Sequence, residues 1–159
     1  MDPMRRYWFP VLGYNYRLTN VAAAIGCAQL ERFQAFIEER RRIAALYEAR
    51  LAPRASQLCI QLPSEAPWAH RVHWLYSVRV PSQQRDALMA HLAENRIETR
   101  PFFPPMHTLP IHERPEPFPR AEELGATGLN LPTWHGVSED DIDRVCRCVL
   151  AFLESEARS

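Results

Sequence analysis

A long stretch with helical periodicity, from Asn20 to about Ala52, constrains the fold of this 159-residue chain more than any other feature. Thr19 precedes the stretch and offers a side-chain oxygen as N-cap. Apolar residues recur along it at helical spacing and charged residues occupy the other faces. The apolar stripe comprises Leu30, Phe33, Ile37, Ala44, Tyr47 and Leu51. The pattern predicts one long helix whose wide apolar face needs a partner surface beyond a small sheet.

Alternation of apolar and polar residues from Arg71 to Val80 is typical of a strand with one buried face. In this interpretation Trp74 and Tyr76 lie on the apolar side and belong to the core. Two shorter strands are expected as well, at 97–100 and, with a weaker pattern, at 58–62.

Two further segments have helical patterns, and each has a candidate cap. Ser82 can cap a helix that runs to about Asn95. Ser138 and Asp141 resemble a capping box with aspartate in place of glutamate. The helix that follows is expected to bury Ile142, Val145, Val149 and Phe152.

Prolines crowd one part of the chain: eight of the 14 lie between Pro101 and Pro132. Each removes a backbone donor and restricts φ, so this part is expected to be mostly loop, with a short helix near 121–124. The order of elements predicts a small α+β domain over 19–159, with a short, at least partly antiparallel sheet and helices on one side. Residues 1–18 are expected to form an extended lead-in.

The charged residues restrict the chemistry of the chain. Its 19 basic residues balance 19 acidic ones, so no net field recruits nucleic acid or an anionic membrane. All 19 basic residues are arginine. Because a guanidinium keeps its proton in proteins, it cannot act as the amine of a Schiff base. Lysine-dependent covalent chemistry is therefore excluded for this polypeptide.

Cysteine usage predicts reduced, packed thiols and a cytoplasmic setting. The four cysteines form no CxxC pair, so no metal site is expected. His70 and His73 are three apart on an expected strand, where their side chains would point to opposite faces. No apolar run approaches the ~20 residues of a membrane span, and no signal-peptide pattern is expected.

Several motifs occur in the order typical of one enzyme family. They are GYNYRLTNVAAAIGCAQLE from Gly13, HWLYSVRV from His73, IETRPFFPPMHTLP from Ile97, LNLP from Leu129, and a final helix beginning SEDDID. The chain thereby resembles the C-terminal small domain of DegT/DnrJ/StrS-type nucleotide-sugar aminotransferases. The third motif is most similar to the perosamine-synthase branch of that family.

The resemblance implies a fold-type-I, pyridoxal-phosphate-dependent aminotransferase that works as a homodimer on a nucleotide-linked 4-keto-6-deoxy sugar. In the family a large N-terminal domain supplies the Schiff-base lysine, and that domain is absent here. The chain is therefore expected to be incompetent alone and to associate with itself or with a full-length homologue. A non-catalytic interaction module or gene remnant is the alternative interpretation.

The resemblance implies one candidate site residue, and residue chemistry suggests three more. By resemblance, Asn15 matches an asparagine that approaches the cofactor phosphate across the dimer interface, and the guanidinium of Arg17 is suited to bidentate pairing with a phosphate or a carboxylate. His107 and Phe103 offer a polar tip and an aromatic wall to a sugar or base. The alternatives are local turn chemistry for Asn15, an exposed arginine for Arg17 and a solvent-facing loop histidine for His107. No catalytic residue is expected on this chain.

Overall fold

The computed structural model describes residues 12–14 and 16–158 of the chain. It divides the chain into two units, Met1–Gln34 and Ala35–Ser159. The first unit contains helix α1 (Asn20–Glu31), in which no residue is buried. The Oγ1 atom of Thr19 accepts a hydrogen bond from the Ala22 N–H at 3.2 Å, which confirms the expected N-cap.

The prediction of one continuous helix from Asn20 to Ala52 is wrong. Helix α1 ends at Glu31, and helix α2 runs over Phe33–Ala55. At Arg32 the backbone has φ −103° and ψ 1°, and its N–H bonds to the carbonyl of Gln29 at 3.1 Å instead of the one four residues back. This geometry interrupts the α-helical hydrogen-bond ladder without a glycine or proline at the break.

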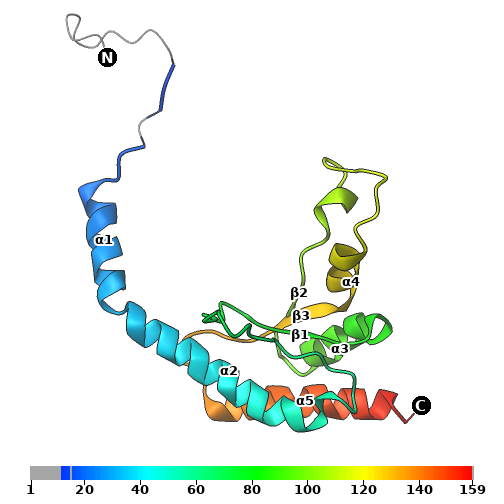
Figure 1. Cartoon of the computed structure of the whole chain (residues 1–159). Helices are drawn as coiled ribbons and strands as arrows, with labels where there is room; N and C mark the ends of the chain where they lie inside the picture. The colour runs from blue at the N-terminus through cyan, green and yellow to red at the C-terminus, as the bar shows by residue number, and fades with distance from the viewer. Residues whose placement is uncertain (1–11, 15, 159) are drawn as a thin grey trace, which may run out of the picture. The chain divides into compact units, whose positions relative to one another are not determined.

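Three short strands form the sheet of the second unit: β1 (Tyr76–Arg79), β2 (Arg100–Pro101) and β3 (Gly128–Leu131). Their order is β1-β3-β2, and both pairings are antiparallel. The central strand β3 therefore links two segments that lie far apart in the sequence (Figure 1).

The strand predictions are confirmed only in part. The expected strand from Arg71 to Val80 forms only at Tyr76–Arg79, and the one expected at 97–100 overlaps β2 at Arg100 alone. The segment 58–62 contributes one isolated bridge, between Gln61 and Arg79.

One face of the sheet packs on α2, α3 (Ser82–Glu94) and α5 (Glu139–Glu156), as expected. Helix α4 (Pro119–Thr127) lies on the other side, where Arg79 bonds to Thr127, so the helices are not all on one side. In Figure 1, α2 and α5 lie together beneath the sheet, and Arg50 of α2 pairs with Glu139 and Asp143 of α5. Buried side chains from the sheet, α2, α3 and α5 form one hydrophobic core. The largest are Ile43, Tyr47, Leu51, Tyr76, Leu88, Leu92, Leu129, Leu131, Ile142 and Leu153.

Tyr76 is a core residue, as expected, and its ring stacks on Tyr47 with centroids 4.7 Å apart. Trp74 is not, because 69% of its surface is exposed. Trp74 and Leu75 form a bend that follows the positive φ of 48° at His73, and β1 begins only at Tyr76. Trp74 therefore lies outside the strand, and the alternation of faces does not extend to it.

The final helix begins as predicted, with the Ser138 hydroxyl accepting from the Asp141 N–H at 3.1 Å. Ser82 is not the N-cap of α3, because it is the first residue of the helix and Pro81 occupies the N-cap position. The proline-rich segment is mostly loop, interrupted by the short 3₁₀ turn η1 (Met106–Thr108) and by α4 (Pro119–Thr127), which is longer than expected.

Candidate functional site

His107 lies in η1 and is held by α4. Its Nε2 atom is 3.0 Å from Oε1 of Glu122, and its ring centroid lies 4.8 Å from that of Phe118. The same Glu122 oxygen accepts a hydrogen bond from the Phe118 N–H at 2.8 Å. Only 12% of the His107 side chain is exposed. The imidazole therefore ties the loop to the start of α4 and leaves little of its surface for a ligand.

Phe103 lies in the same loop and is 84% exposed. It lines a groove of about 670 Å³, whereas His107 lines a separate cavity of about 430 Å³. Ala121 borders both. The structure thus places the two candidate substrate contacts next to each other without bringing them into one cavity.

The groove that Phe103 lines, called here the sheet-face groove, lies on the side of the sheet that carries Ser77 and Asn130. The Ser77 hydroxyl donates to Asn130 Oδ1 at 2.7 Å, and Asn130 Nδ2 donates to the Arg100 carbonyl at 3.3 Å. The other lining residues are His70, Arg71, Val72, His73, Trp74, Leu75, Phe102, Phe103, Pro105, Ala121, Leu124 and Gly125. A mostly apolar wall, with Arg71 and two histidines at one part of it, therefore surrounds a neutral polar floor.

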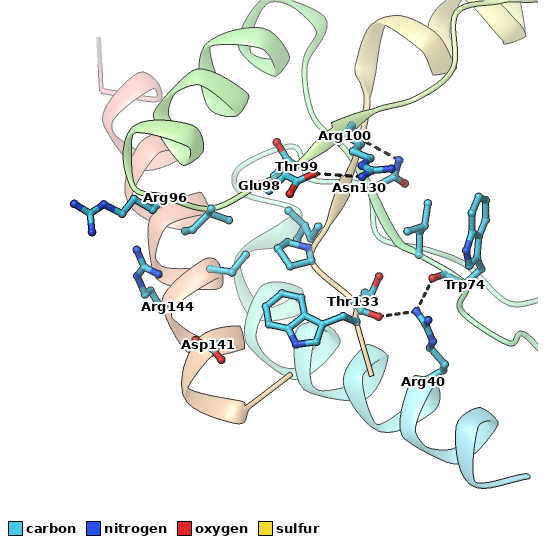
Figure 2. A pocket seen from close by; sticks show the side chains of 16 residues that line it. Arg40, Trp74, Arg96, Glu98, Thr99, Arg100, Asn130, Thr133, Asp141 and Arg144 are labelled. Carbon is cyan, nitrogen blue, oxygen red and sulfur yellow. Dashed lines mark hydrogen bonds and ion pairs between the residues drawn. The ribbon is translucent and has the colours of Figure 1, made fainter. Parts of the chain in front are cut away.

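A third cavity, of about 460 Å³, is shown in Figure 2. Arg40 reaches from α2 to two backbone carbonyls, 2.8 Å from that of Trp74 and 2.6 Å from that of Thr133. Arg144 donates to the carbonyl of Asn95 at the end of α3. The roles of Arg40 and Arg144 were not predicted, because the sequence does not indicate which backbone carbonyl each of the 19 arginines contacts. Both guanidinium groups hold segments of the unit together.

Two titratable groups near the grooves have shifted pKa values. Burial lowers the pKa of His73, and the neighbouring Arg71 adds to this effect, so the neutral imidazole is favoured. The guanidinium of Arg79 lowers the pKa of Glu123 by hydrogen bonding to it, with an added charge effect. The fold thus favours the neutral form of the His73 imidazole at the edge of the groove.

The cofactor candidates lie at the other end of the chain. Asn15 is outside the described residues, and Arg17 is exposed in the segment before α1. The described residues contain no group of three or more histidine, cysteine or acidic side chains arranged for a metal ion. In that part of the chain, no helix combines the length and apolar character needed to cross a membrane.

A covalent pyridoxal phosphate site does not fit this chain on its own. The sequence contains no lysine to form the aldimine. The Cys146 thiol is buried, and burial raises its pKa to about 12, so it offers no nucleophile either.

Comparisons with a family model and with individual proteins indicate the same class of enzyme, the aminotransferases. The model of the DegT/DnrJ/EryC1/StrS aminotransferase family matches residues 1–150. The GDP-perosamine synthase of Caulobacter vibrioides is 45% identical over 150 residues, which are 91% of this chain and 40% of the relative. The GDP-perosamine synthase of Escherichia coli O157:H7 is 38% identical over 96% of this chain and 41% of its own length.

A solved structure agrees with these relatives. DesV of S. venezuelae, crystallised with a ketimine intermediate, superposes with a TM-score of 0.81 and 30% identity over 94% of this chain and 40% of its own. The chain spans about 40% of the length of the relatives and structures it matches. It belongs to the DegT/DnrJ/EryC1/StrS aminotransferase family.

Proposed function

We propose that this chain is the C-terminal small domain of a fold-type-I, pyridoxal-phosphate-dependent aminotransferase acting on a nucleotide-linked 4-keto-6-deoxy sugar. One observation carries the proposal: the match covers 91% of this chain but 40% of a GDP-perosamine synthase. The absence of lysine agrees with it, because the Schiff base must then come from another part of the enzyme. Nothing in the comparisons favours the alternative of a non-catalytic module.

The chain contributes positioning, not covalent chemistry. When bound, the cofactor supplies an electron sink for the transfer of the amino group. In our proposal Asn15 and Arg17 donate hydrogen bonds to the cofactor phosphate of a neighbouring subunit in a cytoplasmic homo-oligomer. Phe103 offers its exposed ring to the sugar nucleotide. His107, held by Glu122, keeps the loop of Phe103 in place, and any contact that it makes with the substrate is limited to the 12% of its side chain that is exposed.

The nucleotide is proposed to be GDP. The relatives named as GDP-perosamine synthases are 38–45% identical to this chain. The dTDP-4-dehydro-2,3,6-trideoxy-D-glucose 4-aminotransferase of Saccharopolyspora spinosa is 30% identical over 79% of it. The higher identity favours a GDP-linked substrate.

A chimera tests the proposal. This chain replaces the matching segment of the Caulobacter vibrioides enzyme, and transfer of an amino group to GDP-linked and dTDP-linked 4-keto-6-deoxy sugars is measured. We expect turnover with the GDP-linked sugar and slower turnover with the dTDP-linked one. A chimera that folds and holds the cofactor but aminates neither sugar would refute the proposed function.

A further inference from the structure

We infer that Arg114 recognises the guanine base of the sugar nucleotide, in the cavity beside the sheet-face groove. This role rests on the proposed function for the class of ligand and adds a residue that selects the nucleotide. The cavity, called here the loop cavity, has a volume of about 430 Å³ and belongs to the second unit, Ala35–Ser159. Its lining residues are Met106, His107, His112, Arg114, Phe118 and Ala121.

The loop cavity and the sheet-face groove meet at Ala121, which borders both. A nucleotide-linked sugar has two ring systems joined by a diphosphate, so two neighbouring cavities match its shape. The groove has a neutral polar floor of Ser77 and Asn130, whose side chains can exchange hydrogen bonds with sugar hydroxyl groups. The sugar therefore belongs in the groove, and the loop cavity is left for the base.

The walls of the loop cavity suit a flat ring. Phe118 and Met106 line it with 47% and 61% of their surfaces exposed. The His107 ring supports Phe118, with the two ring centroids 4.8 Å apart, and Glu122 lies 3.0 Å from the other edge of that imidazole, at Nε2. Because every base has a π-face, stacking on Phe118 does not distinguish guanine from other bases. Selection of the base requires a polar side chain.

Arg114 provides that side chain. Of the described residues that line the loop cavity, Arg114 alone has a permanent charge, and none is a carboxylate. Its backbone is held in place, because its N–H donates to the His107 carbonyl at 3.1 Å. A guanidinium presents paired N–H donors, and guanine has two acceptors on one edge, O6 and N7. Adenine has one acceptor and one donor on that edge, and thymine has one acceptor beside a methyl group, so Arg114 favours guanine.

Equilibrium binding of nucleotides to the chimera tests the inference. GDP, ADP and dTDP share a diphosphate and differ in the base, and calorimetry measures the Kd of each. Arg114→Ala should weaken GDP binding about 5- to 150-fold, the range for one bidentate contact to a base, and leave ADP and dTDP binding unchanged. Arg114→Gln, which also lacks the guanidinium, should weaken GDP binding as well. The matched control is Arg120→Ala, at a side chain that is 95% exposed and lies outside the cavity, and it should bind GDP like the parent chimera.

The outcomes separate this role of Arg114 from the proposed function. Equal losses for all three nucleotides would assign Arg114 to the diphosphate and overturn the inference, and so would unchanged GDP binding, even if the chimera is active. A loss confined to GDP in a chimera that aminates neither sugar would support the inference and count against the proposed function alone. A parent chimera that binds GDP and ADP equally would overturn the inference without any variant, so the test holds even if a substituted chimera fails to fold.

Discussion

At the scale of single residues, Gly128 shows how closely the loop and the sheet approach. A Cβ atom added at Gly128 would lie 2.3 Å from the ring of Phe102, whose N–H donates to the Gly128 carbonyl at 3.1 Å. Gly128→Ala should therefore destabilise the fold by about 1–3 kcal/mol, the cost of forcing a ring out of its place. Urea unfolding measures this cost.

A glycine with free space around it is the matched control. Nothing lies within 4 Å of a Cβ added at Gly26, which sits within α1. Gly26→Ala should leave stability unchanged or raise it by up to about 1 kcal/mol, because alanine is the better helix former. Equal losses for the two variants would show that the contact with Phe102 is not what excludes a side chain at Gly128.

His73 should make stability depend on pH. Its pKa is lowered in the fold from 6.5 by burial, so the unfolded chain takes up the proton first as the pH falls. The stability present above the unfolded pKa is therefore lost as the pH drops through it towards the folded value. Urea midpoints at about pH 7.5 and about pH 5.5 should show a smaller loss for His73→Asn than for the parent chain.

Asparagine is the suitable replacement at this position because it tolerates the positive φ of 48°. Arg71, Arg41, Glu65 and Glu48 act on His73 as well and are unchanged in the variant. His112→Asn, at an exposed histidine, is the matched control. Identical pH dependence in the parent chain and in His73→Asn would contradict the assignment.

Asn15 and Arg17 are proposed to serve a neighbouring active site and not the fold of this chain. Replacing either with alanine should change the stability of the isolated chain by no more than about 1 kcal/mol. In the chimera the same changes should weaken cofactor retention, measured by dialysis and absorbance. If Asn15→Ala unfolds the isolated chain and leaves cofactor retention in the chimera unchanged, Asn15 forms a local turn instead.

At the scale of elements, the two serines near helix starts make a matched pair. Ser138 caps α5 through the Asp141 N–H, whereas α3 has no side-chain cap bond and Ser82 is its first helical residue. Ser138→Ala should cost about 1 kcal/mol, and Ser82→Ala should cost clearly less. Urea unfolding of the two variants compares them directly, and equal losses would contradict the capping role.

The elements that sequence reasoning identified are those with long periodic patterns or a cap. The start of α5 follows from side-chain chemistry, and spacing correctly places Ala44, Tyr47 and Leu51 on the buried face of α2. Leu30 and Phe33, from the same predicted stripe, are exposed. The break at Arg32 and the strand β3 did not follow. Nothing in the residue types at Arg32 marks the break, and β3 is four residues long, too short for an alternation to stand out.

Of the candidate site residues, which stay predictions, Asn15 came from the resemblance, and Arg17, His107 and Phe103 came from the chemistry of their side chains. Composition alone excluded an aldimine, because the chain contains no lysine. The contact of His107 with Glu122 and the hydrogen bond from Arg40 to the Thr133 carbonyl could not be predicted from the sequence. Each joins two segments that come close together only in the complete fold. Trp74 is exposed and not in the core as predicted, because the alternating pattern does not indicate that the chain bends at Trp74 and Leu75 before β1 begins.

At the scale of the whole molecule, we propose that this chain completes a cofactor site whose Schiff-base lysine comes from another part of the enzyme. Borohydride reduction in the presence of pyridoxal phosphate, with the modified residue mapped by mass spectrometry, tests this most directly. The isolated chain should carry no stoichiometric internal adduct, apart from weak labelling of the Met1 amino group. The chimera should carry one adduct per chain, on a lysine of the Caulobacter vibrioides portion. A stoichiometric adduct on an internal residue of the isolated chain, or a folded chimera that traps no cofactor, would contradict the account.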